Sequence, residues 1–207
     1  MEGWPGIIGP LIALLIGVAL PLILRKRKKA EGSKLHELFQ HFWGVGVQVS
    51  QAEHDDARGR IGLGSASGQK AEGVAVFEDR SIDSATVIST STQYGTTYFI
   101  NYLVKAPNIS AARMLKRTRL TKRRSPLIWG RVMGIQWKGD VSLAQTLNFD
   151  YSLADRLLKA DGKVVTGNIG IIPEPKHGYV RIKTDYSLPS AEAFEALCSI
   201  ARHIKAW

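Results

Sequence analysis

Cysteine is nearly absent from this sequence: the 207 residues contain one, Cys198, so an internal disulfide is excluded. A single free cysteine suits a reducing compartment. Cys198 lies near Phe194, Leu197 and Ile204, at the spacing of one buried helical face. We therefore expect this thiol to pack in a core as a small hydrophobic group, not to act as a nucleophile.

Motifs for catalysis and nucleotide binding are also lacking. After Gly62 and Gly64, the third glycine of a dinucleotide-binding motif comes one residue late, and Lys70 is not followed by the Ser or Thr of a P-loop. No nucleophile elbow is present, and the histidines are not at metal-ligand spacing. We expect no catalytic residue, no cofactor and no metal, and non-enzymatic function is favoured.

Acidic residues are missing between Asp83 and Asp140, and this gap shapes the charge of the whole chain. The gap contains ten basic residues: Lys105, Arg113, Lys116, Arg117, Arg119, Lys122, Arg123, Arg124, Arg131 and Lys138. Their charge equals the net charge of +10, so the basicity is local. A local basic segment predicts an anionic partner.

Two kinds of anionic partner fit this segment, acidic lipid headgroups and an acidic protein. The predicted contact residues are Arg25, Lys26, Arg27, Lys28, Lys29, Lys116, Arg117, Arg119, Lys122, Arg123 and Arg124. A solvated basic loop without a specific ligand is the alternative. Nucleic acid is disfavoured, because no zinc finger or RNP-type aromatic motif accompanies Trp129 and Trp137.

The longest uncharged stretch runs from Gly3 to Leu24 and is followed directly by five basic residues. At about 1.5 Å per residue, a helix over this stretch can cross a hydrocarbon layer roughly 30 Å thick. A cleaved signal peptide fits poorly, because Glu2 stands where a basic region is required. We therefore expect a single transmembrane helix that acts as a signal anchor in the lipid bilayer.

The charges flanking this run also predict its orientation. Lysine and arginine are retained in the cytoplasm, which places the N-terminus outside the cell membrane and the C-terminal domain in the cytoplasm. Gly9, Ala13 and Gly17 recur every four residues, a pattern that favours association of the helix with another helix. A plain anchor without such association is the alternative.

The remaining chain predicts an α+β domain with a mainly antiparallel sheet packed with helices. Apolar residues at helical spacing predict a helix over 35–43, for which we favour core packing over a membrane interface. Capping patterns begin helices at Ser142, Ser152 and Ser190, the last one long and amphipathic. Strands are expected at 74–77, 86–88, 97–104, 127–138, 163–172 and 178–184, with a proline-containing turn between the last two.

These elements divide the chain into three expected parts. Residues 1–30 form the transmembrane anchor and its basic block, residues 31–72 an amphipathic helix and a glycine-rich connector, and residues 73–207 the α+β domain. We expect a membrane-anchored binding or scaffolding module whose basic surface contacts acidic headgroups or an acidic protein. A membrane-tethered enzyme is the first alternative, and a membrane-tethered nucleic-acid-binding domain is the second.

Overall fold

A computed structural model describes residues 34–53, 56–64, 68–106, 116–125, 131–160 and 168–206. These residues form an eight-stranded sheet in the order β1-β2-β3-β4-β8-β7-β5-β6, in which neighbouring strands are antiparallel. The strands are β1 (Val49–Gln51), β2 (Gln69–Phe77), β3 (Ser84–Thr92), β4 (Gly95–Lys105), β5 (Thr118–Ser125), β6 (Arg131–Lys138), β7 (Gly170–Glu174) and β8 (Tyr179–Asp185).

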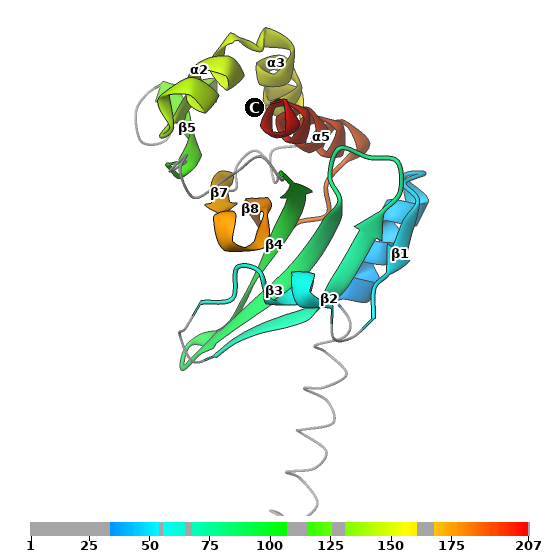
Figure 1. Cartoon of the computed structure of the whole chain (residues 1–207). Helices are drawn as coiled ribbons and strands as arrows, with labels where there is room; N and C mark the ends of the chain where they lie inside the picture. The colour runs from blue at the N-terminus through cyan, green and yellow to red at the C-terminus, as the bar shows by residue number, and fades with distance from the viewer. Residues whose placement is uncertain are drawn as a thin grey trace, which may run out of the picture.

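Four α-helices and two short 3-10 helices accompany the sheet in the described ranges (Figure 1). The α-helices cover 34–44, α2 (Val141–Phe149), α3 (Tyr151–Lys159) and α5 (Ala191–Lys205), and the 3-10 helices are η1 (Ala57–Arg60) and η2 (Pro175–His177). The sheet and the C-terminal helix confirm the predicted antiparallel α+β arrangement of this part.

Side chains along β3 and β4 alternate between the two faces of the sheet, and the two faces have different surroundings. Val87 pairs with Ile100, and Ala85 pairs with Tyr102; all four side chains belong to the buried core beneath the helices. Successive residues of a strand point to opposite faces, so the pair Thr86 and Asn101 points away from the α-helices, to the side on which η1 and the turn after it pack. We call the two sides the helix face and the opposite face.

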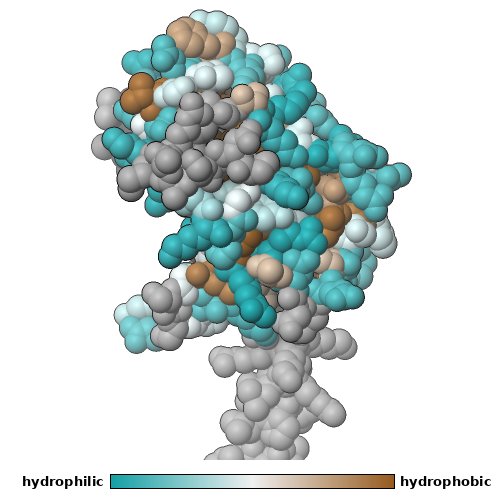
Figure 2. Space-filling model, in the orientation of Figure 1, coloured by the Kyte–Doolittle hydropathy of each residue, from teal (hydrophilic) through white to brown (hydrophobic). Residues whose placement is uncertain are grey.

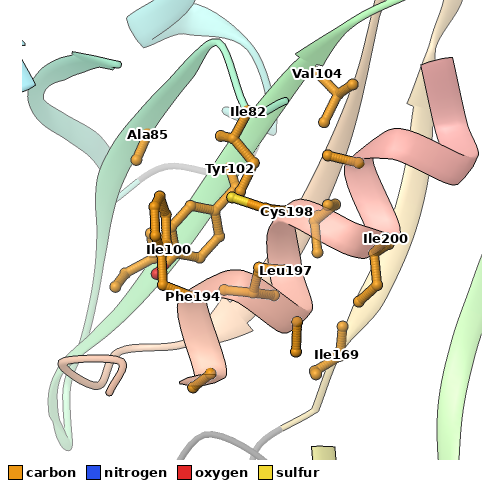
Figure 3. Close-up of a cluster of buried hydrophobic side chains, with 14 of the residues drawn as sticks. Ile82, Ala85, Ile100, Tyr102, Val104, Ile169, Phe194, Leu197, Cys198 and Ile200 are labelled. Atoms are coloured by element: carbon orange, nitrogen blue, oxygen red, sulfur yellow. The ribbon is translucent and has the colours of Figure 1, made fainter. Parts of the chain in front are cut away.

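The core lies between the helix face and α5 (Figure 3). Phe194, Leu197 and Cys198 of α5 point toward Ile100 and Tyr102 of β4 in this view. Cys198 is buried, which confirms its predicted packing role, and burial raises the pKa of its thiol to about 11. The thiol therefore stays protonated at neutral pH.

The helix over 34–44 packs into the same core, as predicted. The ring centroid of Phe42 lies 4.9 Å from that of Phe194 and 5.0 Å from that of Phe77, and Phe42 is fully buried. Tyr186 donates a hydrogen bond of 2.9 Å to the carbonyl of Lys34 and ties the start of this helix to the segment before α5.

The expected division of the chain into residues 1–30, 31–72 and 73–207 stays a prediction.

Helix starts are fixed by side-chain caps. Ser190 accepts a hydrogen bond of 3.2 Å from the backbone N–H of Ala193, which confirms the predicted start of α5. The caps of α2 and α3 are Asp140 and Asp150, two residues before the serines expected there. Aspartate caps a helix as well as serine does, and here the carboxylates lie at the first free N–H groups.

The predicted transmembrane helix is corrected. No helix in the described ranges is long and apolar enough to cross a membrane. The longest, α5, has 15 residues and carries Glu192, Glu195 and Arg202; at about 1.5 Å per residue it spans about 22 Å, well short of the roughly 30 Å required. The predicted single-pass signal anchor is therefore wrong for the part of the chain that the structure describes. The apolar run 3–24 lies outside that part.

Strand prediction was accurate for most of the sheet but missed one end strand and one inner strand. The expected strands within β2, β3, β4 and β8 are present, and the proline-containing turn between β7 and β8 is formed by η2 and by Gly178 at φ +69°. Two strands were not predicted, β1 and β5. β5 is the more consequential, because it contains four of the ten basic residues: Arg119, Lys122, Arg123 and Arg124.

Candidate anion-binding site

Where the structure describes the basic segment between Lys116 and Ser125, the chain lies mostly in β5, next to the end strand of the sheet, and not in a loop. Lys116 and Arg117 directly precede β5, and the predicted contact residues from Arg119 to Arg124 lie within it. β5 pairs with β6 from Arg119 to Ser125 and with β7 at Thr118 and Arg119. The basic block Arg25, Lys26, Arg27, Lys28 and Lys29 lies outside the described residues, as do Gly9, Ala13 and Gly17.

Strand geometry separates these basic side chains onto two faces. Leu120 is buried in the core, so it points to the helix face, and Lys122 lies on the same side by alternation. Arg119 and Arg123 are exposed and point to the opposite face. The structure therefore brings together only part of the predicted contact set.

A cavity of about 250 Å³ opens beside the start of β5. Its wall includes Phe99 of β4, Arg117 and Arg119 from the start of β5, Gly170 of β7, and Lys183 and Asp185 of β8. These residues are far apart in the sequence, and the strand order β4-β8-β7-β5 makes them neighbours. We call this feature the basic cavity.

Lys183 was missed by the sequence reasoning. It lies outside the stretch without acidic residues, and only the pairing of β8 with β7 and β4 places it next to the basic segment. Its Nζ lies 3.9 Å from the ring centroid of Phe99, within the range of a cation–π contact. Alternation of charged and apolar residues in β8, from Val180 to Asp185, is the signal that indicates its face.

Burial and like charge both act on Lys183. Partial burial lowers the pKa of its ammonium group, nearby Arg181 and Arg117 lower it further, and Asp185 opposes the change. Arg181 is itself paired, because its Nε lies 2.7 Å from a carboxylate oxygen of Glu174. The ammonium of Lys183 therefore lies in an environment that disfavours its charge.

The wall of the basic cavity holds three cations and one carboxylate. Within the described residues, no ion pair joins Arg117, Arg119 or Lys183 to a carboxylate. Asp185 accepts a hydrogen bond of 3.2 Å from the backbone N–H of Asn168. The cavity wall thus has a formal excess of two positive charges, which an anion would balance.

The backbone around the cavity positions Arg117. A Cβ atom at Gly170 would lie 3.8 Å from Nη2 and 3.9 Å from Nε of Arg117, so the guanidinium lies against bare backbone. Gly139 adopts φ +143°, and a side chain there would collide with the carbonyl of Arg117 and with Cα of Thr118. Gly139 therefore lets the chain before β5 lie close to the end of β6, whereas a side chain at Gly170 would meet Arg117 at ordinary van der Waals distance.

A second cavity, of about 570 Å³, lies between the helix over 34–44 and strands β1 and β2. Its wall is largely apolar, with Leu35, Phe39 and Trp43, and includes the polar side chains of His36 and Gln40. Trp43 donates a hydrogen bond of 3.1 Å to the carbonyl of Val49. Figure 2 shows a mainly hydrophilic surface in its view, with hydrophobic residues in small separate spots.

Four titratable residues of types that serve in acid–base catalysis, Asp140, Asp150, Asp155 and His177, do not meet in one site. Asp140 caps α2, Asp155 pairs with Lys159 on α3, and His177 lies in η2 at the turn between β7 and β8. Asp150 caps α3 and contacts His203 of α5. No group of three potential metal ligands lies together in the ranges that the structure describes. These positions provide no geometry on which to base a reaction.

Comparison with protein families, curated proteins and solved structures finds no match to this chain. The function of the chain is therefore inferred from its fold and from the basic cavity. They define an antiparallel α+β domain that places a small polar cavity with excess positive charge on the face opposite its helices.

Proposed function

We propose that this chain is a binding module that contacts acidic phospholipid headgroups through the opposite face of its sheet. The observation that carries the proposal is the basic cavity, where Arg117, Arg119 and Lys183 meet and form no ion pair with a carboxylate of the described residues. Arg123 extends this positive surface along β5. We call these four side chains the basic face.

The surroundings of the basic face favour small anionic groups over an acidic protein. Stable protein interfaces usually have a fully buried centre rich in apolar and aromatic side chains. The large hydrophobic residues exposed in the described ranges are Trp43, Tyr94, Val141, Phe149, Tyr151 and Leu158, and none belongs to β5, β7 or β8. A headgroup layer requires no apolar centre, because basic side chains bind it by charge at about 1 kcal/mol each.

Vesicle binding of the full chain tests this function. Phosphatidylcholine vesicles with phosphatidylglycerol should bind the protein more tightly than vesicles without it, and this difference should shrink as salt shortens the screening length below about 8 Å. Binding to the neutral vesicles measures the contribution of the rest of the chain. Equal binding to both vesicles would overturn the proposal.

Paired variants locate the contact. The double variant Arg119→Gln and Arg123→Gln removes two exposed cations from the basic face, and it should weaken binding to acidic vesicles by about 2 kcal/mol, or roughly thirtyfold. Lys159→Gln and Lys176→Gln remove the same charge elsewhere and should have little effect. An acidic peptide or single-stranded nucleic acid that competes at far lower concentration than lipid would instead favour the partners that we reject.

A further inference from the structure

The size of the basic cavity restricts what it holds. Its volume of about 250 Å³ lies just below the range of roughly 300–1,000 Å³ that is typical of cavities for drug-sized ligands. Two arginines, a lysine and an aspartate share its wall with only a few apolar groups. A small, strongly polar group therefore fits this space better than an extended apolar ligand does.

The charge of the cavity wall distinguishes between kinds of anion. Arg117, Arg119 and Lys183 contribute three positive charges and Asp185 one negative charge, which leaves an excess of two. A phosphate monoester carries about −1.5 to −2 at pH 7, because its second pKa is about 6. A phosphate diester lacks that second ionisation and so leaves about one positive charge unbalanced.

The arginines supply matching hydrogen-bond geometry. A guanidinium group is a planar fork that binds phosphate oxygens in pairs, and charge-assisted bonds of this kind are stronger than neutral ones. Arg117 lies against the backbone of Gly170, and Arg119 pairs with the same residue across the β5–β7 ladder. Both side chains thus approach the cavity from one edge, whereas Lys183 approaches from β8.

We propose that the basic cavity binds one phosphate monoester in its dianionic form, held by Arg117, Arg119 and Lys183. This inference rests on the proposed function, because it names the group that the basic face recognises. The phosphate is carried either by a lipid headgroup such as phosphatidic acid or by a soluble phosphorylated compound. Both sources present the same chemistry to the cavity, and the test separates them.

The pH dependence of binding should come mainly from the ligand. The charged groups around the cavity are Arg117, which directly precedes β5, Arg119 of β5, and Lys183 and Asp185 of β8; Phe99 and Asn168 carry no charge. Arg181 lies nearby on β8 and is paired with Glu174. Histidine is the side chain whose charge ordinarily changes near neutral pH, and none lines the cavity among the described residues.

Calorimetric titration of the full chain with glycerol 3-phosphate tests the inference. Affinity should rise between about pH 5 and pH 7, as the monoester loses its second proton. Dimethyl phosphate, which is a diester, should bind at least tenfold more weakly at pH 7 and show no such rise. Equal affinity for the two compounds, or a flat pH profile for the monoester, would overturn the inference.

Variants assign the binding to this cavity. Lys183→Gln should weaken glycerol 3-phosphate binding about tenfold or more, since a hydrogen bond to a charged group is lost. Lys176→Gln removes the same charge from the exposed residue Lys176 of η2 and should bind as the parent does. Equal weakening in both variants would show that only net charge matters and would contradict a defined site. Thermal unfolding of both variants verifies that they are folded.

Vesicles containing phosphatidic acid or phosphatidylglycerol at equal surface charge identify the source. If the protein prefers vesicles with phosphatidic acid, the phosphate monoester belongs to a lipid headgroup. If the protein binds glycerol 3-phosphate but binds no acidic vesicle, the ligand is a soluble compound; this result refutes the proposed function and leaves the phosphate site intact. Tight binding to acidic vesicles without binding of the monoester refutes this inference and leaves the proposed function intact.

Discussion

Asp150 and His203 join the start of one helix to the last turn of another. The carboxylate Oδ2 of Asp150 lies 2.8 Å from Nε2 of His203, and Oδ1 accepts a hydrogen bond of 2.9 Å from the backbone N–H of Leu153. Burial raises the pKa of Asp150, but the hydrogen bonds from His203 and Leu153 outweigh it and hold the pKa below its usual value. One side chain therefore caps α3 and ties it to α5.

Two substitutions separate these roles of Asp150. Asp150→Asn keeps a good cap and loses the charge, so the free energy of unfolding should fall by about 1 kcal/mol or less. Asp150→Ala loses both and should cost about 2 kcal/mol. Chemical unfolding measures both values. Equal losses for the two variants would show that the cap contributes nothing.

Acid should remove the contribution of Asp150 to stability. The pKa of its carboxyl group is lower in the folded chain than in the unfolded chain, so its contribution is present above the ordinary value of about 3.9. It is lost as the pH falls through the lower folded pKa. Asp150→Asn should therefore differ from the parent in stability at neutral pH and converge with it in strong acid.

Phe42 should be essential to the fold, because its buried ring packs against the rings of both Phe77 and Phe194. Phe42→Ala should lower the free energy of unfolding by about 3–5 kcal/mol. Trp43, the next residue, is 64 % exposed, so Trp43→Ala should cost far less. Similar losses for the two variants in denaturant titrations would show that the helix over 34–44 does not use its inner face for packing.

Much of the fold could be predicted from the sequence, because the segments that form its core have strong local patterns of apolar and capping residues. The apolar spacing of Leu38 and Phe42 predicts a helix packed in the core, and both residues are fully buried. Ser190 starts α5 as its capping pattern requires. Patterns of this kind depend on neighbours in the sequence, so they need no knowledge of the tertiary structure.

β5 was missed because its sequence hides the alternation of a strand. Only Leu120 supplies an apolar residue between Thr118 and Arg123, so charge masks the period of two. Only part of the basic cavity could be predicted from the sequence. Arg117 and Arg119 were predicted as contact residues because they lie in a stretch of basic residues. Lys183 becomes their neighbour only through the strand order of the sheet, a long-range property that no local sequence pattern encodes.

Gly139 should be required for both stability and anion binding. Its φ of +143° is unfavourable for other residues, and a Cβ would collide with the carbonyl of Arg117. Gly139→Ala should therefore cost at least about 2 kcal/mol of unfolding free energy and weaken glycerol 3-phosphate binding by displacing Arg117. Gly134→Ala is the matched control, because a Cβ at Gly134 of β6 meets no atom within 4 Å. Equal effects of the two alanines in unfolding and calorimetric titrations would contradict this reading.

Lys183 should illustrate a conflict between binding and stability. Burial, together with Arg181 and Arg117, lowers the pKa of its ammonium group, so the charged form is less favourable in the folded chain than in the unfolded chain. Without ligand, Lys183→Gln should therefore unfold at the same temperature as the parent or at a higher one, although it binds the phosphate monoester less well.

The pH dependence of this effect has a definite sign. Because the folded pKa of Lys183 lies below the unfolded value, the unfolded chain holds more protons in the alkaline range between the two values, and the parent gains stability there as pH rises. The stability difference between Lys183→Gln and the parent should consequently shrink on going from neutral to alkaline pH. Saturating glycerol 3-phosphate should stabilise the parent more than the variant. Thermal scans across pH, with and without the monoester, measure both effects. A variant that is less stable than the parent without ligand would show that Lys183 supports the fold through its contact with Phe99 and that its charge carries no penalty.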